Sequence, residues 1–146
     1  MGMKPRVLIV DDELDVLELI DFKLSGEGFE VLRAATGLEA LHKARCESPD
    51  VIVLDLMLPD LDGLVVCQIL CAQPSTRDVP VVVFSALERP ITRSRGAKIE
   101  VSHWLQKGSG LDSLSDCVRA ALREHLERVR LRLNAEEPSC RAVSEH

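Results

Sequence analysis

VIVLDLMLPDLDG, residues 51–63, decides the fold of this chain. Four apolar residues lead to a carboxylate at Asp55, and Pro59 and the Asp62-Gly63 pair then break the pattern. A continuous apolar run of this length predicts a strand buried on both faces, as in a parallel sheet covered by helices. Asp55 then lies where the strand reaches the surface, at the edge where open α/β sheets bind ligands.

Strand and helix alternate along the rest of the chain. Apolar runs are followed by amphipathic segments, and glycine, proline or polar residues separate them. This order predicts an α/β fold with right-handed crossovers and a parallel sheet. The segment 87–100 is a weak helix, because Pro90 fits only its first turn and Gly96 weakens its later part. The expected strands are 6–10, 29–34, 51–54, 80–84 and 101–106, and helices are expected near 16–24, 38–44, 64–71, 87–100 and 111–133.

A second group of acids follows the first expected strand, at Asp11, Asp12 and Glu13. Asp12 alone could be a helix N-cap, with Glu13 favoured by the dipole of the first turn. If the first and third strands are parallel neighbours, however, these acids meet Asp55 at one edge of the sheet. Carboxylates crowded together repel one another unless a cation compensates them. Oxygen ligands with room for water and phosphate suit Mg²⁺, so we expect a magnesium site here.

Composition narrows the class of protein. The 146 residues fit one domain with a real core, since 46% are hydrophobic. A net charge of −6 argues against direct binding to nucleic acid, and no apolar run is long enough for a membrane span or a secretory signal. The five cysteines lack paired metal-ligand spacing, which predicts free thiols and a cytoplasmic location. Cys67 and Cys71 share a helix face and are expected to be small core residues rather than metal ligands.

The last helix is longer than a small domain needs. Its apolar residues keep helical spacing from Leu111 to Leu133, about 34 Å at 1.5 Å per residue. We expect its end to project as a homodimer contact or a connector, while a solvated face with a few leucines stays open as the alternative. We expect a core domain at 5–125, and a helix overhang with a disordered tail or truncated linker at 126–146, with the tail beginning at Asn134.

Taken together, these features resemble the receiver domain of two-component response regulators. That family has an acidic pair after the first strand, an Asp after the third, a Ser or Thr and a small residue after the fourth, and a Lys after the fifth. The resemblance covers about residues 5–125. It implies a flavodoxin-like, doubly wound five-stranded parallel sheet of order 2-1-3-4-5 with five helices, the last of them extended. Here the pattern reads Asp11-Asp12, Asp55, Ser85-Ala86 and Lys107.

The resemblance also implies a reaction. Asp55 would attack the phosphorus of a phosphohistidine on a sensor histidine kinase or histidine phosphotransfer protein, or of a small donor such as acetyl phosphate. Asp11, Asp12, Asp55 and the backbone carbonyl of Met57 would hold Mg²⁺ or Mn²⁺. The chain would be no enzyme beyond catalysing its own phosphorylation and slow dephosphorylation.

The remaining family positions imply a switch. Lys107 would neutralise a phosphoryl oxygen, and Ser85 with the amide of Ala86 would bind the phosphoryl group on its arrival. Trp104 stands three residues before Lys107, where the family has a Tyr or Phe that moves inward; it could instead only cover the edge of the core. The surface formed by the fourth helix, fifth strand and last helix would then carry the signal to a partner or output domain.

Two positions depart from the family pattern. Gly108 follows Lys107 where the family usually has a cis proline, so we expect a trans bond or a looser loop. Met57 and Leu87, two residues after Asp55 and Ser85, cannot orient an attacking water, so we expect a long-lived phosphorylated state.

Several other readings use the same residues. A degenerate receiver would act only as a phosphorylation-independent interaction or dimerisation module. A haloacid dehalogenase-like phosphatase needs a second Asp where this chain has Met57, and a flavodoxin would need a phosphate-binding turn where this chain has acids. His125 could be imagined as a phosphorelay histidine, although a single His on an exposed helix is usually only solvated.

Overall fold

The computed structural model describes residues 4–86 and 101–144, with side chains described up to residue 135. Within these residues, five strands form one parallel sheet in the order β2-β1-β3-β4-β5. The predicted α/β class and strand order are therefore confirmed. The strands are β1 (Arg6–Val10), β2 (Glu30–Ala34), β3 (Val51–Leu54), β4 (Val81–Ser85) and β5 (His103–Gln106), and the helices are α1 (Leu14–Gly26), α2 (Gly37–Glu47), α3 (Gly63–Ala72) and α4 (Leu111–Ser144).

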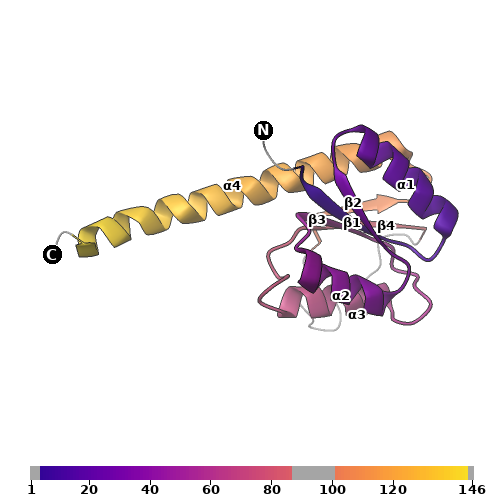
Figure 1. Cartoon of the computed structure of the whole chain (residues 1–146), viewed down its shortest axis with the longest axis horizontal. Coiled ribbons are helices and arrows are strands. Elements are labelled where there is room, and N and C mark those ends of the chain that lie inside the picture. Colours follow the sequence, from indigo (N-terminus) through magenta and orange to yellow (C-terminus); the bar gives the residue numbers. More distant parts are fainter. Residues whose placement is uncertain (1–3, 87–100, 145–146) are drawn as a thin grey trace.

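Helices cover both faces of the sheet, with α1 and α4 on one side and α2 and α3 on the other (Figure 1). Successive strand residues point to opposite faces, so β1 contributes Val7 and Ile9 to the core under α1 and α4. Leu8 and Val10 belong to the core under α2 and α3. This two-sided burial explains why the inner strands are continuous apolar runs rather than alternating ones.

The helix count differs from the expected five, because the described residues contain four helices. The weak helix expected at 87–100 lies outside the described residues. The fifth strand begins at His103, two residues later than expected.

The last helix differs from the prediction at its end. A disordered tail was expected from Asn134, but α4 continues to Ser144. The apolar spacing stops at Leu133. Ala135, Glu136 and Glu137 are good helix formers, and α4 then continues past Pro138, a residue that disfavours a helix interior. The division between a core domain at 5–125 and an overhang from 126 stays a prediction, since α4 passes that point without a break.

The overhang of α4 is plain in Figure 1, where the helix extends far beyond the sheet. Its 34 residues make a rod of about 51 Å. Its fully buried apolar residues, Leu114, Val118 and Ala121, all lie in the first third of the helix. None of the helices in residues 4–86 and 101–144 combines the length and apolarity that crossing a membrane requires.

Candidate functional site

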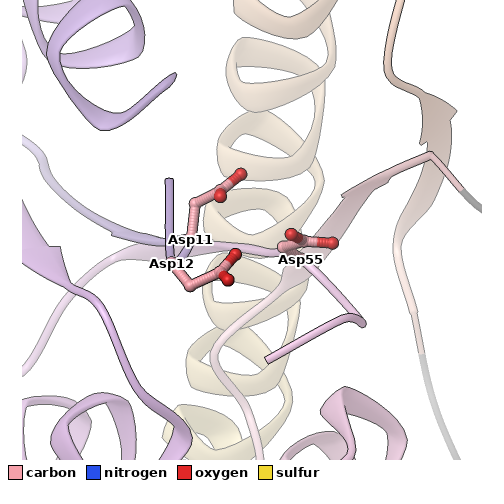
Figure 2. Close-up of side chains that lie close together, drawn as sticks. All are labelled: Asp11, Asp12 and Asp55. Atoms are coloured by element: carbon pink, nitrogen blue, oxygen red, sulfur yellow. The ribbon is translucent and has the colours of Figure 1, made fainter. Parts of the chain in front are cut away.

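The two acid groups meet at the carboxyl edge of the sheet. The backbone of Asp55 donates to the carbonyl of Val10 at 3.0 Å, and the backbone of Asp11 donates to that of Ala34 at 3.1 Å. These bonds extend the sheet by one step and place the two acids side by side. Asp11, Asp12 and Asp55 each offer a carboxylate oxygen within 4.8 Å of the others, and Figure 2 shows the three side chains together. The predicted convergence is thus present in the structure.

Lys107 joins the two buried acids. Its Nζ lies 2.7 Å from Oδ2 of Asp11, 3.1 Å from Oδ2 of Asp55 and 3.6 Å from Oε1 of Glu13. The backbone of Lys107 donates to the carbonyl of Ser85 at 2.8 Å, which fixes the residue at the end of β5 beside β4. Glu13, the third acid of the group that follows β1, is therefore a further charged residue of the site.

Each buried carboxylate uses its other oxygen to bind nearby backbone. Oδ1 of Asp11 accepts from the backbone of Glu13 at 2.9 Å, and Oδ1 of Asp55 accepts from that of Met57 at 3.1 Å. Both acids are at most 3% exposed. A carboxylate held at both oxygens has a defined orientation, so the arrangement exists before any ligand binds.

The charges of this cluster do not balance. Burial raises the pKa of Asp11, although hydrogen bonds from Lys107 and from the backbone of Glu13 oppose the change. Burial alone would lower the pKa of Lys107, but its hydrogen bonds to Asp11 and Asp55 outweigh burial and raise it. The ammonium of Lys107 contacts Asp11, Glu13 and Asp55, and Asp12 adds a fourth acid to the cluster. Hard carboxylate oxygens in such excess suit a divalent cation.

Gly63, the first residue of α3, fixes the position of the loop that follows β3. Its backbone donates to the carbonyl of Leu56 at 2.9 Å. A Cβ at this position would lie 2.4 Å from Cα of Leu56 and 2.8 Å from the carbonyl oxygen of Asp55. Asp62 caps α3 by accepting from the backbone of Leu64 at 2.9 Å. Only glycine lets α3 begin this close to the residue that follows β3.

Asp60 anchors the same loop from its other side and was missed in the sequence. Its carboxylate accepts from the backbone of Gly37 at 2.7 Å and of Leu38 at 2.9 Å, at the first turn of α2. These bonds, led by that from Leu38, lower the pKa of Asp60. Thr36 and Glu39 do mark the start of a helix in the sequence, but nothing there connects that start to residue 60.

Ser85 and Trp104 lie beside the acids in the expected elements. Ser85 is the last residue of β4 and is 1% exposed, and Ala86 follows it at the surface. Trp104 pairs in register with Val83 and packs, partly buried, against the core under α2 and α3. Their roles in a switch stay predictions.

Of the positions that depart from the family pattern, Gly108 and Met57 lie within the described residues and Leu87 does not. Gly108 has φ +104, and all peptide bonds in the described residues are trans, which confirms the expected trans bond. Proline, whose ring fixes φ near −65°, could not adopt this backbone. Met57 is 55% exposed beside Asp55, while Leu87 lies outside the described residues.

Other residues considered from the sequence lie apart from the site. Cys67 is fully buried, and burial together with neighbouring Cys71 raises its pKa to about 12, which fits a small core residue. His125 lies on α4 about 21 Å along the helix from Leu111, and therefore far from the end that follows Lys107.

Comparisons with known proteins identify the family of this chain. The family model described as the response regulator receiver domain matches residues 7–119. The alkaline phosphatase synthesis transcriptional regulatory protein PhoP of Bacillus subtilis is 35% identical over 121 residues, which are 83% of this chain and 50% of that protein. The response regulator PleD of Caulobacter vibrioides is 40% identical over 105 residues, 72% of this chain and 23% of that protein.

A solved structure shows the same relationship. The receiver domain of the Francisella response regulator 1452 is 31% identical, covers 83% of this chain and 98% of its own, and has a TM-score of 0.73. This chain spans half or less of the length of the two curated relatives above. With its acids, lysine and sheet order as described, the chain belongs to the response regulator receiver domain family.

Proposed function

We propose that this chain is a phosphorylatable signalling switch whose phosphoryl acceptor is Asp55. The observation that carries the proposal is the placement of Asp55, buried at a strand end, oriented by the backbone of Met57 and contacted by Lys107. The donor is a phosphohistidine of a sensor histidine kinase or phosphotransfer protein. An Asp55 oxygen forms the new bond to phosphorus, the bond from phosphorus to the imidazole nitrogen breaks, and its electron pair stays on the imidazole.

The acid cluster supports a role for Mg²⁺ in this reaction. Carboxylate oxygens of Asp11, Asp12 and Asp55 lie within 4.8 Å of one another, and hard oxygen donors fit this cation. These residues would hold the ion, together with the backbone carbonyl of Met57. When bound, Mg²⁺ supplies positive charge that compensates the transferring phosphoryl group.

Lys107 and Ser85 supply the remaining contacts to the phosphoryl group. Lys107 already spans Asp11 and Asp55, so its ammonium can turn to a phosphoryl oxygen over a short distance. Ser85 ends β4 next to Lys107, and the hydroxyl of Ser85 with the amide of Ala86 would bind another oxygen. We propose that Trp104 follows Ser85 inward and changes the surface of β5 and α4.

The exposed face of α1 supports the proposal that the phosphodonor is a protein that docks on this helix. This helix begins two residues after Asp12 and exposes Leu14, Leu19 and Phe22, the last at 85%. Large apolar side chains exposed next to a reactive acid favour a protein partner over a small donor alone. Another copy of this chain, bound through α4, is the second partner that we propose.

The proposal also covers enzymatic activity, nucleic-acid binding, cellular location and the lifetime of the phosphorylated form. We propose that the chain is no enzyme beyond its own phosphorylation and dephosphorylation, and that it does not bind nucleic acid directly, given its net charge of −6. Cys46, Cys67, Cys71 and Cys117 are not joined in disulfide bonds, which supports a cytoplasmic location. Met57 beside Asp55 supports slow hydrolysis, and a decay of the phosphorylated form within seconds would contradict this part of the proposal.

Mass spectrometry of the intact chain after incubation with acetyl phosphate and Mg²⁺ tests the proposal. We expect one added phosphoryl group that is stable in acid, labile in base and absent from Asp55→Asn. Asp62→Asn is a control, because Asp62 lies in the same loop but only caps α3. A chain that takes up no phosphoryl group, from acetyl phosphate or from a phosphorylated histidine kinase, would instead be a degenerate receiver.

A further inference from the structure

His42 and Cys46 lie next to each other on the exposed side of α2. They are four residues apart, so the helix places them one above the other on the same face. Both side chains are exposed. Sγ of Cys46 lies 3.9 Å from Nδ1 and 3.8 Å from Nε2 of His42. The surface of α2 therefore presents a thiol and an imidazole as a pair.

The separation of the pair is close to that of two ligands on one zinc ion. Zinc binds a thiolate at about 2.3 Å and an imidazole nitrogen at about 2.0 Å, so tetrahedral coordination places sulfur and nitrogen about 3.5 Å apart. The observed 3.8 and 3.9 Å exceed this value by only a few tenths of an ångström. A rotation of the imidazole about its soft χ2 torsion can direct either nitrogen at the ion.

Neighbouring charged groups leave the pair open to a cation. Lys43 follows His42, but its Nζ donates to the backbone carbonyl of Arg33 at 2.5 Å and is held there. Glu39 precedes His42 by three residues, but its Oε1 accepts from the backbone of Ala35 at 2.7 Å, so it is engaged at the start of α2. Cys46 lies in the last turn, where the helix dipole favours the net positive charge of a zinc–thiolate unit.

This end of α2 lies away from the acid cluster. Nη1 of Arg6, the first residue of β1, donates to the carbonyl of Glu47 at 2.7 Å. The pair therefore stands near the start of β1, whereas Asp11 and Asp55 lie at the carboxyl ends of the strands. The two sites also differ in chemistry, because carboxylates prefer Mg²⁺ whereas a thiolate with an imidazole prefers Zn²⁺.

We propose that His42 and Cys46 bind one zinc ion at the surface of α2. The thiol proton leaves to solvent as the bond from sulfur to zinc forms, neutral His42 gives its nitrogen lone pair, and water fills the remaining positions. Two protein ligands rather than four give a dissociation constant on the order of 1–100 µM. The proposal is independent of phosphoryl transfer, since it uses no residue of the acid cluster.

Alkylation of Cys46 by iodoacetamide, followed by peptide mass spectrometry, tests the site. Zinc-bound thiolate is a poorer nucleophile than free thiolate, so Zn²⁺ is expected to slow the reaction with a midpoint below about 100 µM. Each chain is compared with its own rate without Zn²⁺. His42→Gln is expected to raise the midpoint about ten-fold or more, while His125→Gln, the same change on α4, leaves it unchanged.

Two further measurements separate this site from the acid cluster. Excess Mg²⁺ and the substitution Asp55→Asn are each expected to leave the midpoint unchanged. A midpoint that shifts with either of them would place the ion at the acid cluster and overturn the proposal. Cys46 that is unprotected at about 1 mM Zn²⁺, or protected equally in wild type and His42→Gln, would overturn it as well.

Discussion

Replacing Gly63 with alanine is expected to destabilise the chain and displace Asp55. The added Cβ would lie 2.4 Å from Cα of Leu56 and 2.8 Å from the carbonyl oxygen of Asp55, whereas ordinary contact begins at 3.4 Å. Both atoms belong to the backbone, so α3 or the end of β3 must move by roughly 1 Å. Overpacking of this kind costs about 1–3 kcal/mol, and weakening the hydrogen bond from Gly63 to Leu56 adds up to about 1 kcal/mol.

Thermal unfolding measures this cost. A loss of about 2–4 kcal/mol lowers Tm by roughly 5–15 °C in a chain of this size. Because Asp55 adjoins the displaced backbone, the rate of phosphorylation by acetyl phosphate is also expected to fall. Gly26→Ala is the control, since a Cβ at this last residue of α1 meets nothing within 4 Å, and its Tm is expected to stay equal or rise. A Gly63→Ala chain with wild-type Tm and wild-type phosphorylation would refute the reasoning.

Three further substitutions test the charges and the docking face. Lys107→Met leaves Asp11 and Asp55 without their cation, so stability in chelator is expected to fall by about 2 kcal/mol or more, with Mg²⁺ restoring part of it; an unchanged urea midpoint would contradict this. Hydrogen bonds from Ser115, Lys23 and Arg119 lower the pKa of Glu27 to about 2, so its contribution to stability is present above about pH 4.5 and is lost as the pH falls toward 2. The difference in Tm between wild type and Glu27→Gln is therefore expected to be largest at neutral pH and to shrink in acid, and a difference independent of pH would count against the Glu27 contacts. Phe22→Ala is expected to slow phosphotransfer from a histidine kinase about ten-fold while leaving the rate with acetyl phosphate unchanged, and equal slowing with both donors would argue against docking on α1.

The sequence predicts the parts of the molecule that depend on local pattern. Apolar runs, separated by glycine, proline or polar residues, predict the strands. Because the carboxyl ends of parallel strands meet at one edge of the sheet, they bring Asp11, Asp55 and Lys107 together there. The acids of the cluster could thus be named from the sequence alone.

Contacts between distant segments could not be predicted in this way. Asp60 binds the start of α2, although 22 or more residues separate them, and Glu27 meets Ser115 across 88 residues. Such pairs depend on how α1, α2 and α4 pack on the sheet, and no spacing in the chain encodes that packing. The continuation of α4 to Ser144 was missed for another reason: the residues beyond Leu133 lack an apolar period and include Pro138, which disfavours a helix interior.

The proposed function depends on acids from two strand ends forming one divalent-cation site around Asp55. Calorimetric titration with Mg²⁺ tests it most directly, on wild type, Asp12→Asn and the control Asp15→Asn, which removes an equal charge from the first turn of α1. Wild type and Asp15→Asn are each expected to bind one ion per chain, and the affinity of Asp12→Asn is expected to be at least about ten-fold lower. No uptake of Mg²⁺ by wild type at millimolar concentration, or equal affinity in all three chains, would contradict it.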